Sequence, residues 1–530
     1  MSKVRTFLNK NTNLTFASAF IFGVFINLFG LINTIHNYDD IAIQPFGFGT
    51  SVTSGRYVLG ALGGIYHLIF GSYNLPFFNG VVCLLFVALA AKCLVSISDI
   101  QSKKIGIGIG FLFAVFPTTT SVLFFKFTAI FYGFALYLSV LAAKVLIKSK
   151  HGFLLSALLS VLSLGIYQAY LPLTVTILIV YLIKRAIDSD NETFVSVFKT
   201  GLYYCLNIVV SLVVYKLVLD MTIYVCNYFI ESQQELIAAF ANGEAVSKLS
   251  LNSYQGIDQM GKVTILSLFE SIIQSVKSFF MLPFHDYCSL AQTFVLKISY
   301  AVFYLASTSL IIYTIIKNKM KVPLVAIILL MWILFPVCVN LIVVMCPSSE
   351  IYTLMVYAFI MVLCTPLLLW ESMPIIKNKK VYSFVKKGLS ITFALVIISY
   401  SVLLNLNYSK MYFYTRQAEN YANSIVTQVR MTDGFDTNKK WVFVGDINDP
   451  LLKNDWDNVP SYGIPRTTQE MLNMYSRKSW FSNYVGYSIP FANNKADEIR
   501  KTQEFKAMPC WPDEGSIKVI DKYVVIKFEK

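Results

Sequence analysis

Charged residues are scarce in this chain of 530 residues. They make up only 14% of the sequence, whereas hydrophobic residues make up 56%, and the mean hydropathy is +0.60. Soluble globular domains carry roughly a quarter charged residues, so this composition excludes an ordinary soluble protein. It indicates an α-helical polytopic membrane protein whose apolar runs cross the bilayer.

The sequence also lacks the short motifs of several enzyme classes. It contains no Walker loop, no GxGxxG after a strand, no GxSxG and no HExxH. Nucleotide-binding, nicotinamide-dependent, serine-hydrolase and zincin functions therefore have no motif to support them. The nine cysteines are scattered without a CxxC pair, which excludes a zinc ribbon and argues against a disulfide framework.

Acidic residues are fewer than basic ones, 30 against 44, which gives a formal net charge of +14. In a soluble protein such a charge would suggest a nucleic-acid partner. Here the basic residues lie in short clusters between apolar runs, and no nucleic-acid-binding module is recognisable. The charge is explained by the positive-inside bias of membrane proteins, so we expect no nucleic acid.

About eleven apolar runs are candidates for membrane spans. Two of them, over 105–116 and 153–167, are shorter than the roughly 20 residues that a full crossing needs. The runs are Leu14–Ile35, Phe77–Ile97, Ile105–Phe116, Val122–Ile147, Phe153–Tyr167, Leu171–Ile183, Gly201–Leu219, Leu290–Ile316, Val322–Met345, Ile351–Trp370 and Leu389–Leu406.

Lysine and arginine clusters predict the orientation of these runs. They precede the first run and then fall on every second connection, so they share one side, which the bias makes cytoplasmic. The N-terminus is then cytoplasmic and is retained as a first helix. The opposite side receives the connection from Tyr38 to Arg56, turns at Thr118–Ser121 and Gln168–Tyr170, the long connection Asp220–His285 and the C-terminus.

Two further segments on the outer side are predicted to be amphipathic helices at the membrane surface. Tyr57–Phe70 is short and contains three glycines, and Val263–Leu282 repeats apolar residues at helical spacing but includes Glu270 and Lys277. A helix lying along the interface suits such sequences better than a crossing, although a further span over 263–282 remains the alternative.

The composition becomes polar after Leu406. We therefore divide the chain into a transmembrane module over 1–406 and a small extracytoplasmic α/β domain over 407–530. In the second part Tyr412–Val429 has a helical pattern, Lys440–Asp446 is an apolar strand that ends in a turn, and Lys518–Phe528 is a hairpin about Asp521 and Lys522.

Asp39 and Asp40 follow the first apolar run after three intervening residues. Ionisable residues at the membrane are costly, which makes the pair a candidate functional site. A carboxylate at a partly desolvated boundary can have its proton affinity raised until it serves as a general base. The alternative is a solvated loop cap at the end of a helix, where a negative charge opposes the helix dipole. These patterns do not choose between the two residues.

Two cations on the same side are candidates for phosphate binding. Arg56 follows a glycine-rich loop, and its planar fork can bind a phosphate through two parallel hydrogen bonds. Lys126 lies in an otherwise apolar stretch soon after the Thr118–Ser121 turn. Either side chain could instead extend to the lipid headgroups.

Further residues on this side are candidate sugar or acceptor contacts: Tyr38, Tyr167, Gln168, His285 and Asp286. Tyrosine and glutamine can hydrogen-bond sugar hydroxyls, although tyrosine at a membrane interface more often belongs to the aromatic belt. One histidine next to one aspartate is a weak metal signal, so no metal site is predicted.

Several stretches together resemble the Gtr-type, GtrII-like O-antigen glucosyltransferase family, which belongs to the GT-C class of polytopic membrane glycosyltransferases. The resemblance runs over nearly the full length of the chain. The matching stretches are Asn37-Tyr38-Asp39-Asp40, Ser54-Gly55-Arg56-Tyr57, Leu164 to Pro172, Arg416 to Ala422 and Pro512 to Lys518.

The resemblance implies a GT-C-like fold and an enzyme of the bacterial cytoplasmic membrane. It would transfer a sugar, typically glucose, from a polyprenyl-phosphate donor to a surface glycan on the outer face. It also implies inversion at the anomeric carbon, with Asp39 or Asp40 as the base and with Arg56 and Lys126 stabilising the phosphate. No cofactor is implied, and a metal requirement is left open. The alternatives are a flippase or transporter of lipid-linked oligosaccharides, and a polysaccharide polymerase.

Overall fold

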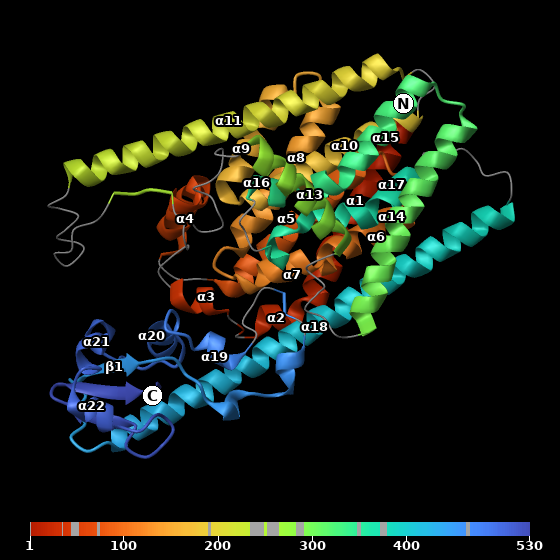
Figure 1. The fold of residues 1–530 in the computed structure, drawn as a ribbon. Helices are drawn as coiled ribbons and strands as arrows, with labels where there is room; N and C mark the ends of the chain where they lie inside the picture. The colour runs from red at the N-terminus through yellow and green to blue at the C-terminus, as the bar shows by residue number, and fades with distance from the viewer. Residues whose placement is uncertain are drawn as a thin grey trace.

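The computed structural model describes residues 2–33, 35, 37–43, 52–71, 75–188, 192–233, 248–251, 264–281, 291–346, 351–371, 379–459, 461–462 and 467–529. Long helices pack side by side into a bundle, and a smaller unit built from the C-terminal residues lies at one end (Figure 1). We call residues 432–529 the C-terminal unit, and the end of the bundle that it adjoins the α3 end.

The bundle is helical throughout the described ranges, with short 3₁₀ turns between some of the helices. The helices are α1 (Ser2–Ile26), α2 (Leu28–Ile32), α3 (Tyr38–Ile43), α4 (Tyr57–Phe70), α5 (Pro76–Ile97), α6 (Lys103–Val115), α7 (Pro117–Phe124), α8 (Ala129–Lys148), α9 (Phe153–Ile166), α10 (Leu171–Asp188), α11 (Phe194–Ser232), α13 (Ile265–Met281), α14 (Ala291–Lys317), α15 (Val322–Val339), α16 (Leu341–Met345), α17 (Ile360–Trp370) and α18 (Lys379–Met431). The 3₁₀ turns are η1 (Val52–Ser54), η2 (Gln168–Tyr170), η5 (Thr353–Met355) and η6 (Tyr357–Phe359).

Long apolar helices dominate the bundle, as predicted. Within the described ranges, eight helices are long and apolar enough to cross a membrane, and three more are apolar but shorter. The predicted first run is divided into α1 and α2 at Asn27, and the run Val322–Met345 is divided into α15 and α16 at Asn340. The amide of Asn340 donates to the Ser275 carbonyl at 3.1 Å, which ties this break to α13.

The prediction of a turn at Thr118–Ser121 is wrong. Pro117 opens a new helix, α7, which continues the direction of α6 across a single break at Phe116, because proline fits the first turn of a helix. Two of the threonine hydroxyls in this segment donate to carbonyl groups of the protein. That of Thr118 donates to the Thr353 carbonyl, and that of Thr119 to the Phe113 carbonyl, both at 2.8 Å. The turn between the spans lies instead at residues 125–128.

The two predicted amphipathic segments are helical. Helix α4 has the predicted bounds, and α13 packs on α15 and α16. Three of the four buried residues of α13 are the serines Ser271, Ser275 and Ser278, and the fourth is Phe279, whereas large apolar side chains such as Phe269 and Phe280 are exposed. This pattern is the reverse of a helix in a soluble core and suits a helix whose outer face meets lipid.

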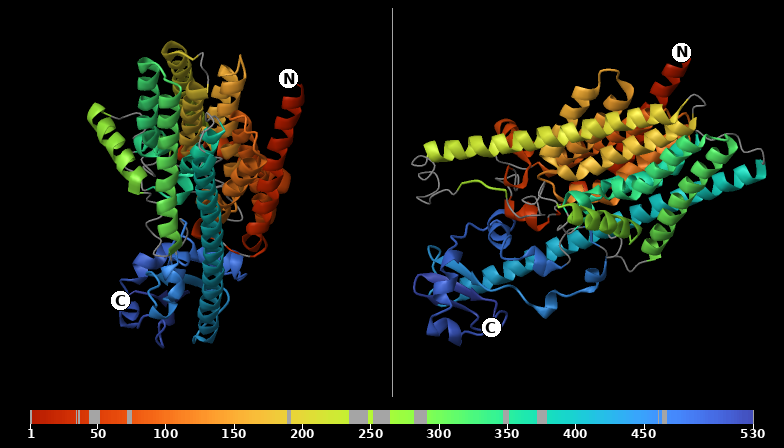
Figure 2. Two further views of the ribbon diagram at one scale, coloured as in Figure 1. Left: turned by 90° about the vertical axis from the view of Figure 1, so that its right-hand side faces the viewer. Right: turned by 45° about the horizontal axis from the view of Figure 1, so that its top comes forward.

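Helix α18 runs without interruption from the bundle to the C-terminal unit (Figure 2). The domain boundary predicted at residues 406 and 407 therefore falls inside one helix of 53 residues. No proline or glycine separates the two predicted helices. Buried side chains continue at helical spacing through the junction, at Leu404, Tyr408 and Met411, so the pattern that packs on the bundle passes directly into the C-terminal core.

The C-terminal unit contains a three-stranded sheet in the order β1-β3-β2. Strand β1 (Lys440–Val444) pairs in parallel with β3 (Tyr523–Lys527), and β2 (Ile517–Ile520) pairs antiparallel with β3. The predicted hairpin is therefore present, with Asp521 at a positive φ of 52° in its turn. Short helical segments lie between β1 and β2 in the chain: η7 (Pro450–Leu452), η8 (Asp455–Asn458), α19 (Thr468–Met471), α20 (Arg477–Ser479), the π-turn η9 (Trp480–Tyr484), η10 (Asn493–Lys495), α21 (Ala496–Ile499) and α22 (Gln503–Ala507).

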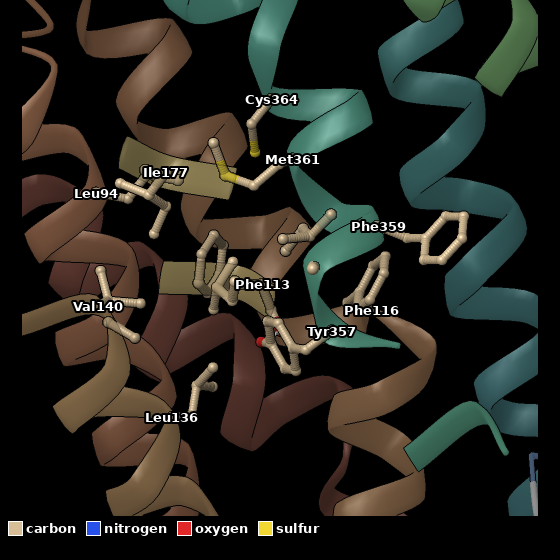
Figure 3. Packing of buried hydrophobic residues seen from close by; sticks show 14 of the residues in the cluster. Leu94, Phe113, Phe116, Leu136, Val140, Ile177, Tyr357, Phe359, Met361 and Cys364 are labelled. Atoms are coloured by element: carbon tan, nitrogen blue, oxygen red, sulfur yellow. Dashed lines mark hydrogen bonds between the residues drawn. The ribbon is translucent and has the colours of Figure 1, made fainter. Parts of the chain in front are cut away.

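Aromatic and aliphatic side chains from several helices form the centre of the bundle (Figure 3). Tyr357 lies against Phe113 and Phe116, with ring centroids 5.9 and 5.4 Å apart. Its hydroxyl bonds that of Thr119 at 2.9 Å. Helices α6 and α7 are thus held to η6, the turn that leads into α17.

Candidate active site

The acidic pair opens a helix rather than closing one. Asp39 and Asp40 lie in the first turn of α3, where a negative charge is favourable. The Asn37 side chain caps this turn by accepting a hydrogen bond from the Asp40 N–H at 2.8 Å, and its amide donates to the Phe124 carbonyl at 2.9 Å. The alternative interpretation, a loop cap at the end of a helix, therefore does not apply, because the pair begins a helix.

Asp40 is fully buried and ties α3 to the break between α7 and α8. Its two carboxylate oxygens accept hydrogen bonds from the backbone N–H groups of Lys126 and Phe127, both at 3.2 Å. A carboxylate that accepts backbone N–H groups in this way stabilises an irregular turn. We therefore interpret Asp40 as a positioning residue.

Lys126 is buried in the same break. Its ammonium group donates to the carbonyls of Gly30 and Asn33 at 3.0 and 3.1 Å, which lie at the end of α2. Its own carbonyl accepts from Asn79 at 3.1 Å. Burial lowers the pKa of Lys126 to about 8, and the nearby Asp40 opposes this shift. The lysine thus connects the end of α2 to α5 and to the turn between α7 and α8.

Asp39 differs from its neighbour because its side chain is only partly covered. Burial is the largest cause of a raised pKa, and the charge of Asp40 adds to it, while Arg56 opposes the shift. Together these effects bring the pKa of Asp39 to about 6. A carboxylate with this pKa is ionised at neutral pH and has an increased affinity for a proton, which are the properties of a general base.

Arg56 follows a turn that two buried side chains hold in place. Gln168 donates to the Ser54 carbonyl at 2.9 Å, and the Tyr215 hydroxyl donates to the Gly55 carbonyl at the same distance. Gly55 has a positive φ of 72°, and a Cβ there would lie 2.4 Å from the Tyr215 hydroxyl oxygen. The turn therefore requires glycine.

The guanidinium group of Arg56 contacts two tyrosine side chains, Tyr132 and Tyr167. It donates to the Tyr132 hydroxyl at 3.0 Å and lies over the Tyr167 ring, 5.2 Å from the centroid. The two rings stack on each other with centroids 4.5 Å apart. Stacking and a hydrogen bond together fix the plane of the fork, which prepares it for a planar or tetrahedral anion.

The C-terminal unit also reaches α3. The Tyr484 hydroxyl donates to the Asp40 carbonyl at 3.2 Å, and the Ser479 hydroxyl donates to the Ala42 carbonyl at 3.4 Å. The acidic helix therefore lies between the bundle and the C-terminal unit (Figure 1).

A family model described as glucosyl transferase GtrII matches residues 28–363. The chain belongs to this family. Comparison with curated proteins and with solved structures gives no match. The matched range begins at α2 and includes the acidic pair, Arg56, Lys126 and Gln168, whereas all of α18 and the C-terminal unit lie outside it. Membership of the GtrII family makes this helical membrane protein a glycosyltransferase.

Several predicted site residues of this GtrII-family protein lie close together. Asp39 and Arg56 influence each other electrostatically, as do Asp40 and Lys126. Tyr38 begins α3 beside the acids. The predicted sugar contacts His285 and Asp286 lie outside the described residues. Among the residues that the structure describes, no group of three or more histidine, cysteine, aspartate or glutamate side chains could hold a metal ion.

Other predicted residues have partners within the protein. Tyr167 and Gln168 are buried and support Arg56 and its turn. Sequence patterns did not indicate Tyr132, Tyr215 or Tyr484. Each is one tyrosine among 32 and has no distinctive spacing, so only the fold could reveal its role.

Proposed function

We propose that this protein transfers glucose from a polyprenyl-phosphate donor to a surface glycan acceptor, such as O-antigen, on the outer face of the bacterial cytoplasmic membrane. The proposal rests on one observation: Asp39 and Arg56 are close enough to interact electrostatically. Asp39 is a partly covered carboxylate with a raised pKa, and Arg56 is held by Tyr132 and Tyr167. The first group can accept a proton and the second can bind a phosphate, which are the two tasks of this reaction.

In the proposed reaction Asp39 removes the proton from an acceptor hydroxyl. The oxygen attacks the anomeric carbon, and the bond from that carbon to the lipid phosphate breaks. The electron pair leaves with the phosphate oxygen, so the configuration at the sugar inverts. Arg56 faces the developing negative charge, and its preorganised fork lowers the energy of the transition state.

Asp40 and Lys126 have positioning roles in this account. Asp40 is engaged with two backbone N–H groups and Lys126 with two carbonyls. An acceptor hydroxyl would have to displace the first pair of contacts to reach Asp40, and a phosphate would have to displace the second pair to bind Lys126 in their place. We therefore assign the catalytic proton transfer to Asp39 and the phosphate contact to Arg56.

The proposed orientation places the α3 end outside the cell. Loops that carry the basic clusters contact one another away from α3, as in the Lys148–Asp99 ion pair at 2.5 Å and the Glu371 carboxylate bound to the Ser102 N–H at 2.5 Å. The positive-inside bias favours a cytoplasmic location for the end of the bundle that carries these basic loops, opposite the α3 end. The donor would then be lipid-borne, since nucleotide sugars are cytoplasmic and the sequence has no nucleotide motif.

The proposal is tested with purified protein in proteoliposomes that contain polyprenyl-phosphate glucose labelled in the sugar, together with an acceptor glycan. We expect a labelled glycosidic product with inverted anomeric configuration. Movement of the labelled lipid across the bilayer without a new glycosidic bond would contradict the proposal and would favour a transporter. Transfer of whole repeat units from a lipid diphosphate would favour a polymerase.

A further inference from the structure

The segment Arg477–Tyr484 of the C-terminal unit is packed directly against α3. It consists of α20 and the π-turn η9, and both contact α3. In Figure 1 these blue elements lie below α3, on the side away from the bundle. We call this segment the α3 clamp.

The clamp supplies hydrogen-bond donors that α3 cannot supply itself. The last four carbonyl groups of any α-helix have no partner within the helix, and in the six-residue α3 these belong to residues 40–43. Tyr484 donates to the first of these carbonyls and Ser479 to the third. Two of the four groups are thus bound by hydroxyls from a segment more than 400 positions away in sequence.

The donors are themselves firmly held. Trp480 is fully buried and stacks on the Tyr484 ring with centroids 5.4 Å apart and planes at 14°. Arg477 is 1% exposed; it donates to the Gly445 carbonyl at 3.0 Å and lies over the Phe528 ring, 4.8 Å from the centroid. The clamp is therefore fixed to the sheet of the C-terminal unit.

The C-terminal unit is in turn anchored in the bundle next to the α3 end. Tyr462 is buried in the bundle core, and its carbonyl accepts from the Ser121 hydroxyl of α7 at 2.7 Å. Its N–H donates to Asn407 of α18 at 3.2 Å. Lys410 donates to the Val459 carbonyl at 2.8 Å. The clamp and the turn at residues 125–128 thus both hold α3 within one connected framework.

We propose that Tyr484 and Ser479 are positioning residues of the transferase site, which hold α3 so that the Asp39 carboxylate faces Arg56. This inference rests on the proposed function, and it gives the C-terminal unit a direct part in the reaction. Neither hydroxyl touches substrate in this account. Each acts through the helix that carries the base.

Loosening the clamp has a defined electrostatic consequence. The groups that face Asp39 and its helix are Asp40 on α3 itself, Arg56 before α4, Lys126 in the turn before α8 and Tyr484 in the clamp. Burial is the largest cause of the raised pKa of Asp39. If α3 moves away from its supports, water reaches the carboxylate and its pKa falls towards the ordinary value of 3.8. The base then becomes weaker as well as misplaced.

The test compares Tyr484→Phe, Ser479→Ala and the double variant with Tyr487→Phe in proteoliposomes. Tyr487 is a matched control because it lies in the same unit and its hydroxyl donates to Asn423 at 3.3 Å in a solvent-exposed hydrogen bond that does not involve α3. We expect kcat to fall about tenfold in Tyr484→Phe and further in the double variant, with the donor KM nearly unchanged. The acid limb of the kcat profile should move to lower pH, whereas Tyr487→Phe should match the unmodified protein.

A second readout does not depend on activity. Asp39→Cys is labelled with a maleimide in membranes, either alone or combined with Tyr484→Phe or Tyr487→Phe, above the background of the native cysteines. We expect faster labelling with Tyr484→Phe only. Equal labelling rates, or unchanged kcat and pH profile in the double variant while Asp39→Asn is inactive, would overturn the inference and leave the proposed function intact. Absence of any glycosidic product from the unmodified protein would instead reject the proposed function.

Discussion

At the scale of single residues, the two adjacent aspartates have different environments. Asp40 is buried and accepts two backbone N–H groups, whereas Asp39 is partly covered and has a pKa raised to about 6. Adjacent side chains on a helix point in different directions, so one can serve structure and the other chemistry. The sequence predicted an acidic site here but could not choose between the two residues, because the choice depends on the turn at residues 125–128.

The raised pKa predicts the pH dependence of transfer. Only ionised Asp39 can accept a proton, so kcat should fall below about pH 6, by up to tenfold per unit. In Asp40→Asn a negative charge that raises this pKa is removed, so the midpoint of the acid limb should move to lower pH. Rates measured from pH 4.5 to 8 on folded protein test this, and a midpoint that stays in place or rises would contradict the electrostatic account.

Arg56 provides a second test at this scale. Arg56→Lys keeps the positive charge but loses the planar fork that lies over Tyr167 and bonds Tyr132. We expect kcat to fall about a hundredfold. Arg416→Lys is the matched control, because Arg416 is exposed and far along α18. Similar rates for the two variants would argue against a phosphate contact at Arg56.

At the scale of elements, apolar periodicity predicted the helices well and their ends less well. Helix α4 has the predicted bounds. The Thr118–Ser121 segment was mispredicted because threonine hydroxyls can bond to carbonyls of neighbouring helices, as Thr118 does to Thr353. The junction in α18 was missed because polar composition after Leu406 suggested a new domain, although the buried positions continue at helical spacing. A change in composition indicates that the helix leaves the membrane, whereas the spacing of the buried residues indicates whether the helix itself continues.

The turn before α4 predicts a sharp contrast between two glycines. In Gly55→Ala the new Cβ would meet the Tyr215 hydroxyl at a positive φ, which should lower the free energy of unfolding by about 1–3 kcal/mol and displace Arg56. In Gly64→Ala nothing lies within 4 Å of the new Cβ, and stability should stay equal or rise by up to about 1 kcal/mol. Thermal unfolding in detergent measures both. Equal effects would show that the turn is not the constraint.

At the scale of the whole molecule, the C-terminal unit and the bundle form one framework around α3. The sequence predicted two separate domains joined near residue 406. The structure instead joins them through α18, through Tyr462 in the bundle core and through the α3 clamp. Such contacts between distant segments leave no local pattern in a sequence, which is why the contribution of the C-terminal unit to the site could not be predicted.

The orientation predicts which ends of the molecule are accessible from outside the cell. Lys522 is in the hairpin turn of the C-terminal unit, and Lys319 is in the basic connection between α14 and α15. We consider the two single variants Lys522→Cys and Lys319→Cys. A membrane-impermeant maleimide applied to intact spheroplasts should label the first variant above the background of the native cysteines and leave the second unlabelled. The reverse pattern would place the site in the cytoplasm and would contradict a donor presented on the outer leaflet.

The most direct test of the central claim is the rate of sugar transfer by Asp39→Asn in proteoliposomes, measured beside Asp497→Asn. Asp497 is an exposed aspartate of the C-terminal unit and serves as the matched control. If Asp39 is the general base, its amide variant should lose about 10²–10⁴-fold in kcat while it folds and binds donor normally, and the control should retain full activity. Full transfer activity in Asp39→Asn would contradict the account.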